Sequence, residues 1–174
     1  MARAMHIFYK DLNFHHGIHD VAQTHRVLPV FLWSEKLNQG VDITPSIAYR
    51  LTWARLFNRQ LLPEKCNLLM VYNIEEIVNL AMLYQVDTVT MLRHYEPAER
   101  EFQAELEVAL KRIGITLKLY ALYTLQAPEA VLKQNGEPYA VFTPYYNKWR
   151  KSLNRICLKK QAIRWLEQPV EPNL

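Results

Sequence analysis

The sequence predicts an α/β fold built on a parallel sheet. Its clearest sign is the stretch Val86–Ala121, where two segments rich in β-branched residues flank a segment with apolar residues at helical spacing. Pro97 suits the first turn of that helix, and Gly114 is a natural stop after its last turn. Strand, helix and strand in succession form a βαβ unit, whose crossover is almost always right-handed.

Short apolar runs elsewhere before residue 122 predict the remaining strands. Val27–Trp33 is apolar throughout, which is typical of a parallel strand buried on both faces. Because these runs alternate with helical patterns, the strands should lie parallel in one sheet with helices on both faces. The predicted strands are His6–Tyr9, Val27–Trp33, Cys66–Tyr72, Val86–Arg93 and Ile115–Ala121.

Capping signals predict the helices between these strands. Thr44 and Pro45 mark the start of a helix that runs to about residue 62, because threonine caps a helix and proline suits its first turn. Asn73 predicts the cap of another helix over Ile74–Tyr84. A short helix is expected around Asp20–Thr24.

From Leu122 onward the alternation stops. Turn signals at Asn135–Gly136 and Pro138 are followed by Tyr146–Leu166, whose apolar residues predict one helix. We therefore divide the chain into an α/β domain over residues 1–125 and a linker-like segment with a C-terminal helix over residues 126–174.

Composition predicts a protein of the reducing cytoplasm. The 174 residues carry a net charge of +4, which is mild and permits contact with nucleic acid or a nucleotide without indicating it. Direct DNA binding and a membrane partner are not expected. Cys66 and Cys157 lie in apolar surroundings and form no ligand spacing, which favours buried thiols. No apolar run is long enough to span a bilayer, and the N-terminus shows no signal-peptide pattern.

Motifs for nucleotide chemistry, catalysis and metal binding are largely missing from the sequence. It contains no GxGxxG and no GxxxxGK[ST] motif, so neither phosphate-binding fingerprint is present. No Ser-His-Asp or Cys-His context predicts a nucleophile, and we assign no catalytic residue. His15, His16 and His19 form an HHxxH pattern, but a third ligand is not well placed, so a polar loop is expected rather than a metal site.

Several short motifs of the sequence resemble the DNA photolyase/cryptochrome family. Val141-Phe142-Thr143-Pro144 and the residues around Gly136-Glu137-Pro138-Tyr139 are similar to the words that close the family's N-terminal α/β domain. Tyr95-Glu96-Pro97 is similar to the exit of its fourth strand, and the resemblance covers roughly residues 5 to 150. It implies a Rossmann-like three-layer sandwich with a five-stranded parallel sheet in the order 3-2-1-4-5. It also implies an antenna chromophore, which in this family is a folate, a deazaflavin or a flavin.

That strand order places a candidate cofactor site where the order reverses, because ligands of such sheets lie at the carboxyl ends of the strands. The loops after the first and fourth strands flank this crevice, and Arg50 lies one turn from a position where the family has a basic residue. Glu96 matches an acidic residue that contacts the chromophore in some members. As an alternative, Asp11 and Glu96 only cap helices. The candidate cofactor-binding residues are Lys10, Asp11, Trp33, Arg50, Arg93, His94 and Glu96, with His15 in the same neighbourhood.

The sequence departs from the family's antenna pattern at several positions. Asn13 stands where an arginine is usual, and Leu92 stands where the fourth strand usually ends in asparagine. An Arg-Asp pair of the following helix falls at Phe102-Gln103. The family's large helical domain, which holds FAD and the DNA lesion, has no counterpart in these 174 residues, so no catalytic FAD and no repair by this chain alone are expected.

Three functions follow as hypotheses. The first is a small-ligand module that binds an antenna chromophore or a nucleotide-like molecule. The second is an interaction subunit that docks on a separate FAD-binding chain through Tyr139–Trp165, or forms a homodimer through Tyr145–Leu166, because this segment carries more apolar residues than one sheet edge buries. The third is an enzyme of the wider nucleotide-binding α/β group, for which no catalytic constellation is visible.

Overall fold

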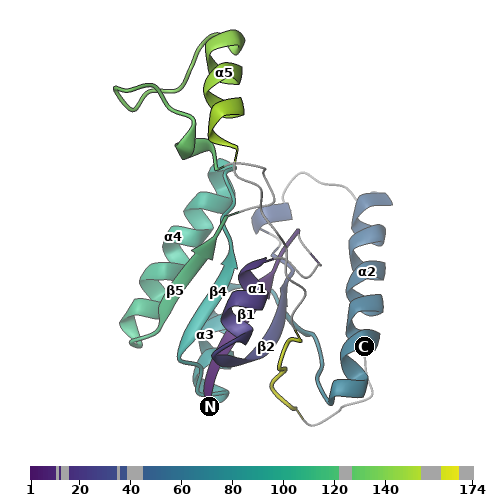
Figure 1. The fold of residues 1–174 in the computed structure, drawn as a ribbon. Coiled ribbons are helices and arrows are strands. Elements are labelled where there is room, and N and C mark those ends of the chain that lie inside the picture. The colour runs from purple at the N-terminus through teal and green to yellow at the C-terminus, as the bar shows by residue number, and fades with distance from the viewer. Residues whose placement is uncertain are drawn as a thin grey trace.

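A five-stranded parallel sheet forms the centre of the molecule in the computed structural model (Figure 1). The structure describes residues 1–10, 12, 16–34, 36–38, 45–121, 127–153 and 162–168. The spatial order β3-β2-β1-β4-β5 and the parallel pairing confirm the predicted fold class and strand order. The strands are β1 (Ala2–Phe8), β2 (His25–Leu32), β3 (Leu69–Val71), β4 (Thr88–Leu92) and β5 (Thr116–Tyr120).

Helices cover both faces of this sheet. On one face, α1 (His16–Ala22) and α2 (Pro45–Leu61) pack on a core that includes Phe8 and Phe31. On the other face, α3 (Ile74–Leu83) and α4 (Pro97–Arg112) pack on a core that includes Ile7. Successive residues of β1 therefore belong to opposite cores, as the alternation of side chains along a strand requires. Short 3-10 helices lie at Lys36–Asn38 (η1), Leu62–Glu64 (η2) and Pro128–Ala130 (η3).

Local signals of the sequence explain where α3 and α4 begin and where α4 ends. The Asn73 side chain accepts a hydrogen bond from Glu76 N, while Glu76 accepts one from Tyr72 N at 2.8 Å, so the two side chains satisfy free amides at the start of α3. Pro97 opens α4, as predicted. Gly114 follows α4 with φ +76°, a left-handed conformation that glycine adopts without strain. Thr44, the predicted cap of α2, lies outside the described residues.

Helix α1 begins earlier than the short helix predicted around Asp20–Thr24. A Cβ atom added at Gly17 would lie 2.5 Å from Cγ of Tyr120, so only glycine allows this approach to β5. Asp20, further along α1, accepts hydrogen bonds from the Tyr120 hydroxyl at 2.8 Å and from Lys118 at 3.0 Å. These contacts fix α1 against the edge strand.

The prediction of one helix over Tyr146–Leu166 is wrong. Helix α5 (Phe142–Ser152) ends at Ser152, and residues 162–168 are not helical and pair with β2 at Val27. There Val27 N donates to Arg164 O at 2.8 Å, and Leu166 N donates to Val27 O at 2.9 Å. The physical reason is that β3 begins its pairing with β2 only at Val30, so the backbone at Val27 has no β3 partner and pairs with this C-terminal segment instead.

Cys66 is a buried free cysteine, as predicted, and burial raises the pKa of its thiol to about 12. Gln168 of the C-terminal segment donates hydrogen bonds to Cys66 Sγ and to Asn67 O. Cys157 lies outside the described residues. Within the part of the chain that the structure describes, no helix is long and apolar enough to cross a membrane. The division of the chain at residue 125 and the cytoplasmic location stay predictions.

Candidate ligand-binding site

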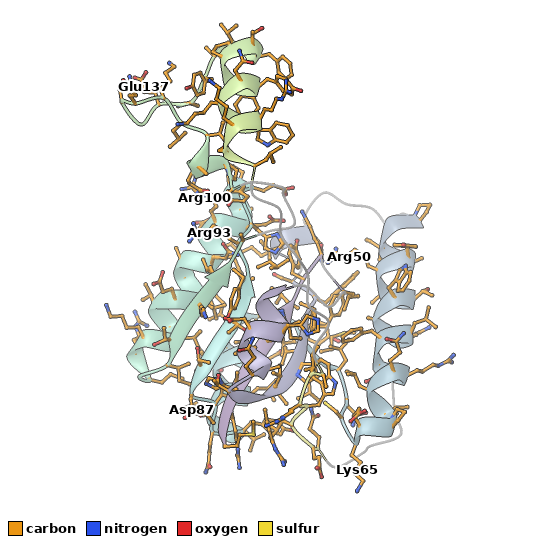
Figure 2. The ribbon with its side chains drawn as sticks, viewed as in Figure 1. Arg50, Lys65, Asp87, Arg93, Arg100 and Glu137 are labelled. Atoms are coloured by element: carbon orange, nitrogen blue, oxygen red, sulfur yellow. The ribbon has the colours of Figure 1, made fainter. Side chains whose placement is uncertain are left out.

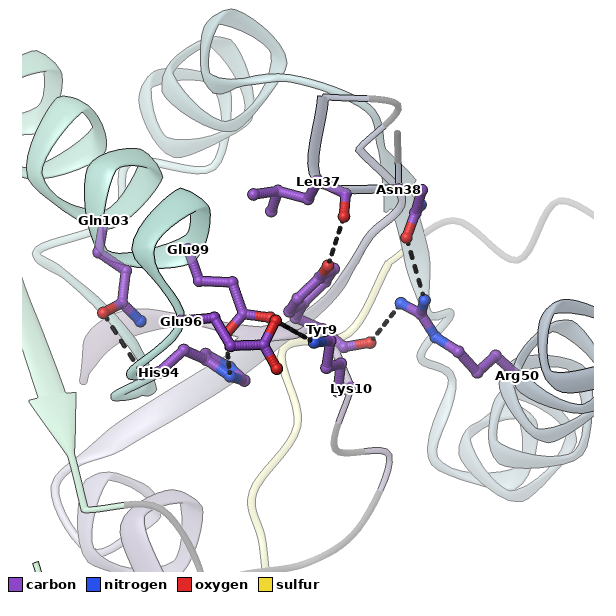
Figure 3. Close-up of polar contacts among 9 residues, drawn as sticks. All are labelled: Tyr9, Lys10, Leu37, Asn38, Arg50, His94, Glu96, Glu99 and Gln103. Carbon is purple, nitrogen blue, oxygen red and sulfur yellow. Dashed lines mark hydrogen bonds and ion pairs between the residues drawn. The ribbon is translucent and has the colours of Figure 1, made fainter. Parts of the chain in front are cut away.

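A polar cluster lies at the carboxyl ends of β1 and β4, next to the point where the strand order reverses. Tyr9 and Lys10 follow β1, and His94 follows β4 by two residues. Figure 3 shows these side chains with their partners from α2, α4 and η1. In open α/β sheets this edge is where ligands bind, so the fold places the cluster where a binding site is expected.

Lys10 pairs with two carboxylates of α4 and its N-terminal flank. Its ammonium lies 2.5 Å from Glu99 Oε1 and 3.1 Å from Glu96 Oε2. Partial burial by itself lowers the pKa of Lys10, but the hydrogen bonds to Glu99 and Glu96 outweigh it, so the pKa is raised. The Glu96 side chain makes no capping hydrogen bond to α4, so among the described residues it acts as an ion-pair partner and not as a helix cap.

His94 is buried beside Glu99. Its Nδ1 lies 3.3 Å from Glu99 Oε2, and its ring meets the Tyr9 ring edge-on at a centroid distance of 5.4 Å. Burial lowers the pKa of His94, so the imidazole is neutral at neutral pH. Because Nδ1 must carry the proton to donate to a carboxylate, Nε2 is left as a hydrogen-bond acceptor. That Nε2 atom is buried and has no partner among the described residues.

Arg50 of α2 lies on the other side of Tyr9. Its guanidinium carbon is 5.1 Å from the ring centroid of Tyr9 and 5.1 Å from that of Trp33, so it contacts two aromatic faces. It donates hydrogen bonds to Tyr9 O at 3.1 Å and to Asn38 Oδ1 at 3.2 Å. Burial lowers the pKa of Arg50, although guanidinium stays charged at neutral pH. Its Nε, and Nδ2 of Asn38, are buried without a partner among the described residues.

The structure brings five of the seven predicted site residues to this cluster. Arg93 is turned elsewhere, because its backbone continues the pairing with β5 and its side chain faces Glu129 at 3.7 Å. Figure 2 shows Arg93 with the other labelled side chains in the view of Figure 1. Asp11 and His15 lie outside the described residues. The five that gather around Tyr9 are Lys10, Trp33, Arg50, His94 and Glu96.

Sequence reasoning missed Tyr9, Glu99 and Gln103. Glu99 follows Glu96 by three residues, a spacing that places both on one side of a helix, and this was the available signal. Gln103 donates to Leu92 O at 2.8 Å and accepts from the backbone N–H of His94 at 3.4 Å. It therefore fixes the backbone at the end of β4.

The described residues contain no group of three metal-ligating side chains. Of the HHxxH pattern, His16 and His19 belong to α1, and His15 lies outside the described residues. The expectation of no metal site stays a prediction.

A parallel 3-2-1-4-5 sheet with a polar cluster at its switch point defines a Rossmann-like α/β domain. The sequence pattern of the DNA photolyase family matches residues 14–167, which is most of the chain. The chain therefore belongs to the DNA photolyase family.

Two proteins of Synechococcus are similar in sequence. An uncharacterized 31.6 kDa protein of the atpI 5′ region in strain PCC 6716 is 28% identical over 157 residues, which are 86% of this chain and 55% of that protein. A deoxyribodipyrimidine photo-lyase of strain PCC 6301 is 24% identical over 132 residues, which are 74% of this chain and 27% of that protein. The chain thus spans about half of one relative and about a quarter of the other.

Solved structures of photolyases and cryptochromes share the fold. A class III photolyase of Agrobacterium tumefaciens aligns with a TM-score of 0.72 at 20% identity, over 87% of this chain and 32% of that chain. A Synechocystis cryptochrome aligns with a TM-score of 0.74 at 20% identity, over 87% of this chain and 34% of that chain. An archaeal photolyase of Sulfolobus tokodaii, described with two FAD molecules that imply a novel light-harvesting cofactor, aligns with a TM-score of 0.67 at 19% identity, over 95% of this chain and 37% of that chain.

Proposed function

We propose that this chain is a module that binds a small aromatic chromophore of the antenna type at the carboxyl ends of β1, β2 and β4. The observation that carries the proposal is the set of three buried nitrogen atoms around Tyr9 that lack partners among the described residues: His94 Nε2, Arg50 Nε and Asn38 Nδ2. Buried polar groups in proteins are nearly always hydrogen-bonded, because leaving one unpaired costs about 1–3 kcal/mol. A bound ligand would supply the missing partners.

The chemistry of these atoms defines the kind of ligand. Nε2 of a neutral His94 accepts a hydrogen bond, so it calls for a ligand N–H or O–H group. Arg50 Nε–H and Asn38 Nδ2–H donate, so they call for carbonyl, carboxylate or phosphate oxygens. A folate, a deazaflavin and a flavin each carry a ring with both N–H and carbonyl groups, and each therefore fits this donor and acceptor set.

The aromatic rings and the charge of the site support the same class. Tyr9 and Trp33 present ring faces beside a fixed cation, and the charge of Lys10 is matched by Glu96 and Glu99. Arg50 is the cation of the cluster that has no carboxylate partner among the described residues. An anionic tail on the chromophore would neutralise it.

The first test is the absorbance spectrum of the protein purified from its host. A band in the near ultraviolet or the blue, lost on denaturation and extraction, is the expected result. Titration of the colourless protein with riboflavin 5′-phosphate, with a reduced folate and with a 5-deazaflavin then identifies the ligand by fluorescence. The proposal fails if the purified protein has no band and none of the three compounds binds.

Variants localise the binding. Arg50→Met and His94→Leu should each raise the dissociation constant by about tenfold or more, because each removes a hydrogen bond to the ligand of about 1–3 kcal/mol. Arg59→Met is the matched control, since Arg59 lies exposed in the last turn of the same helix as Arg50. Binding that is unchanged in both site variants would place the ligand elsewhere.

A further inference from the structure

Helix α5 carries an uncovered aromatic stripe. No residue of α5 is buried, and Phe142 and Tyr146 keep 72% and 39% of their surface exposed. Phe142 stacks on Tyr146 at a centroid distance of 5.6 Å, and Tyr146 stacks on Trp149 at 5.9 Å. In Figure 1 α5 projects from the body beyond the carboxyl ends of β4 and β5. Exposed apolar stripes of this kind mark interaction surfaces.

The charges of α5 are all positive. Lys148, Arg150 and Lys151 flank the aromatic stripe, and the helix contains no acidic residue. Its sequence thus combines large aromatic side chains, which dominate binding energy at interfaces, with a basic rim. Such a helix suits a groove that is apolar at its floor and acidic at its edges.

The body of the molecule has a groove of this kind at the same end of the sheet. It has a volume of about 500 Å³, within the range of sites that hold a few side chains or a small molecule. It lies where β2 and β3 end, between η1, the start of α3 and the face of α4. Its walls include Tyr72, Ile74, Phe102, Glu75, Glu105 and Lys36.

Carboxylates dominate the edge of the groove. Lys36 is the one cation among the described residues that line it, and its ammonium lies 3.0 Å from Glu105. Glu75 in the first turn of α3 has no ion-pair partner among the described residues. Glu101, on α4 four residues before Glu105, acts on Lys36 as well. The edge therefore carries more negative than positive charge, in contrast to α5.

We propose that α5 of one copy docks in this groove of a second copy, and that the two copies exchange their α5 helices in a twofold symmetric dimer. Charge favours a second copy as the occupant, because the basic α5 would meet the acidic edge. Its exposed Phe142 and Tyr146 would also meet apolar groups of Phe102 and Ile74 in the groove. The groove and α5 both lie at the carboxyl edge of the sheet, so one twofold axis allows both contacts at once.

Sedimentation velocity of the full chain tests the proposal. A dimer is expected at roughly 50 µM in low salt, and it should weaken by about tenfold or more at roughly 0.5 M NaCl, because screening removes attraction between exposed charges. Phe142→Ala with Tyr146→Ala should give a monomer. At concentrations where the wild type is also monomeric, its unfolding transition should be unchanged, because neither side chain is buried in the single chain.

Charge reversal gives the decisive comparison. Lys148→Glu with Lys151→Glu makes α5 acidic, and Glu75→Lys with Glu105→Lys makes the groove basic. Each double variant alone should be monomeric, because both of its contacts would repel. A mixture of the two should form a heterodimer, because each acidic α5 then meets a basic groove and each basic α5 meets an acidic groove. Glu107→Lys, on the exposed surface of α4 outside the groove, is the control and should leave the dimer intact.

Three results would overturn the proposal. The first is a wild-type chain that stays monomeric at the highest soluble concentration, even if it then binds a separate FAD-binding chain. The second is a dimer that the groove variants leave unchanged, which would mean that α5 pairs with α5. The third is a mixture of the two charge-reversed chains that does not associate.

Discussion

Replacing Glu99 by glutamine should destabilise the fold far more than the same change at Glu96. Both carboxylates pair with Lys10, but the Glu99 side chain is 6% exposed and the Glu96 side chain is 70% exposed. In Glu99→Gln the amide group brings a donor toward the Lys10 ammonium, which is itself a donor. A hydrogen bond to a charged group contributes about 1.5–3 kcal/mol.

The expected loss for Glu99→Gln lies below the upper end of that range. Lys10 is 43% exposed and keeps Glu96 as a partner, so solvent and the second carboxylate recover part of the energy. We expect a loss of about 1–2 kcal/mol in the free energy of unfolding. Glu96→Gln should change it by no more than about 0.5 kcal/mol, because an exposed ion pair contributes little.

Equilibrium unfolding in urea, followed by tryptophan fluorescence and by circular dichroism, measures both variants. The denaturant slopes should match that of the wild type, so that the shift in midpoint reports stability alone. Two variants of equal stability would refute the reasoning, because burial would then not decide what an ion pair contributes. A larger loss in Glu96→Gln than in Glu99→Gln would refute it as well.

Three further changes test other parts of the structure. Gln103→Leu should cost about 1–3 kcal/mol in urea unfolding, because the carbonyl of Leu92 loses a buried donor. Trp165→Ala should lower the free energy of unfolding by about 1–3 kcal/mol, less than for a fully buried tryptophan, because Trp165 is half-buried against Phe57. Hydrogen exchange at the backbone amide of Val27, which is bonded to the same segment, should then become faster. Burial lowers the pKa of His94, so the unfolded chain binds a proton below about pH 6.5 that the folded chain resists. The wild type should therefore lose stability as the pH falls below that value, by up to about 1.4 kcal/mol per pH unit from this residue. His94→Leu should lack this part of the dependence of the unfolding free energy on pH, measured between pH 5 and 8. Equal pH dependence in the two proteins would contradict the prediction.

The parallel sheet was predictable from the chain because its signals are local. Val27–Trp33 is apolar throughout since β2 is covered on both faces, and the helix of the βαβ unit shows its stripe, its first-turn proline and its glycine stop within one short segment. The strand order followed from a resemblance carried by a few words of sequence, and the sheet confirms it.

The position of the polar cluster was also predictable, but the contacts inside it were not. The carboxyl ends of β1 and β4 meet wherever the strand order reverses, so Lys10, His94 and Glu96 could be placed together without coordinates. That Glu99 and not Glu96 is the buried partner depends on how α4 is rotated against the sheet. Arg93 lies outside the cluster because its backbone extends the pairing with β5 and its side chain faces Glu129. Sequence spacing does not show this.

The sequence by itself determined the alternating elements and the helix boundaries of the βαβ unit, because each depends on neighbours a few residues apart. The edge of the sheet that holds the polar cluster followed from the strand order, which the family resemblance implied. Only the tertiary structure decided the conformation of the C-terminal segment at residues 162–168. Its apolar residues suit a helix as well as an extended strand, and the choice was made by Val27, whose backbone groups lie beyond the reach of the short β3 strand. An unpaired buried backbone group is costly, and a distant segment that satisfies it overrides the local preference for a helix.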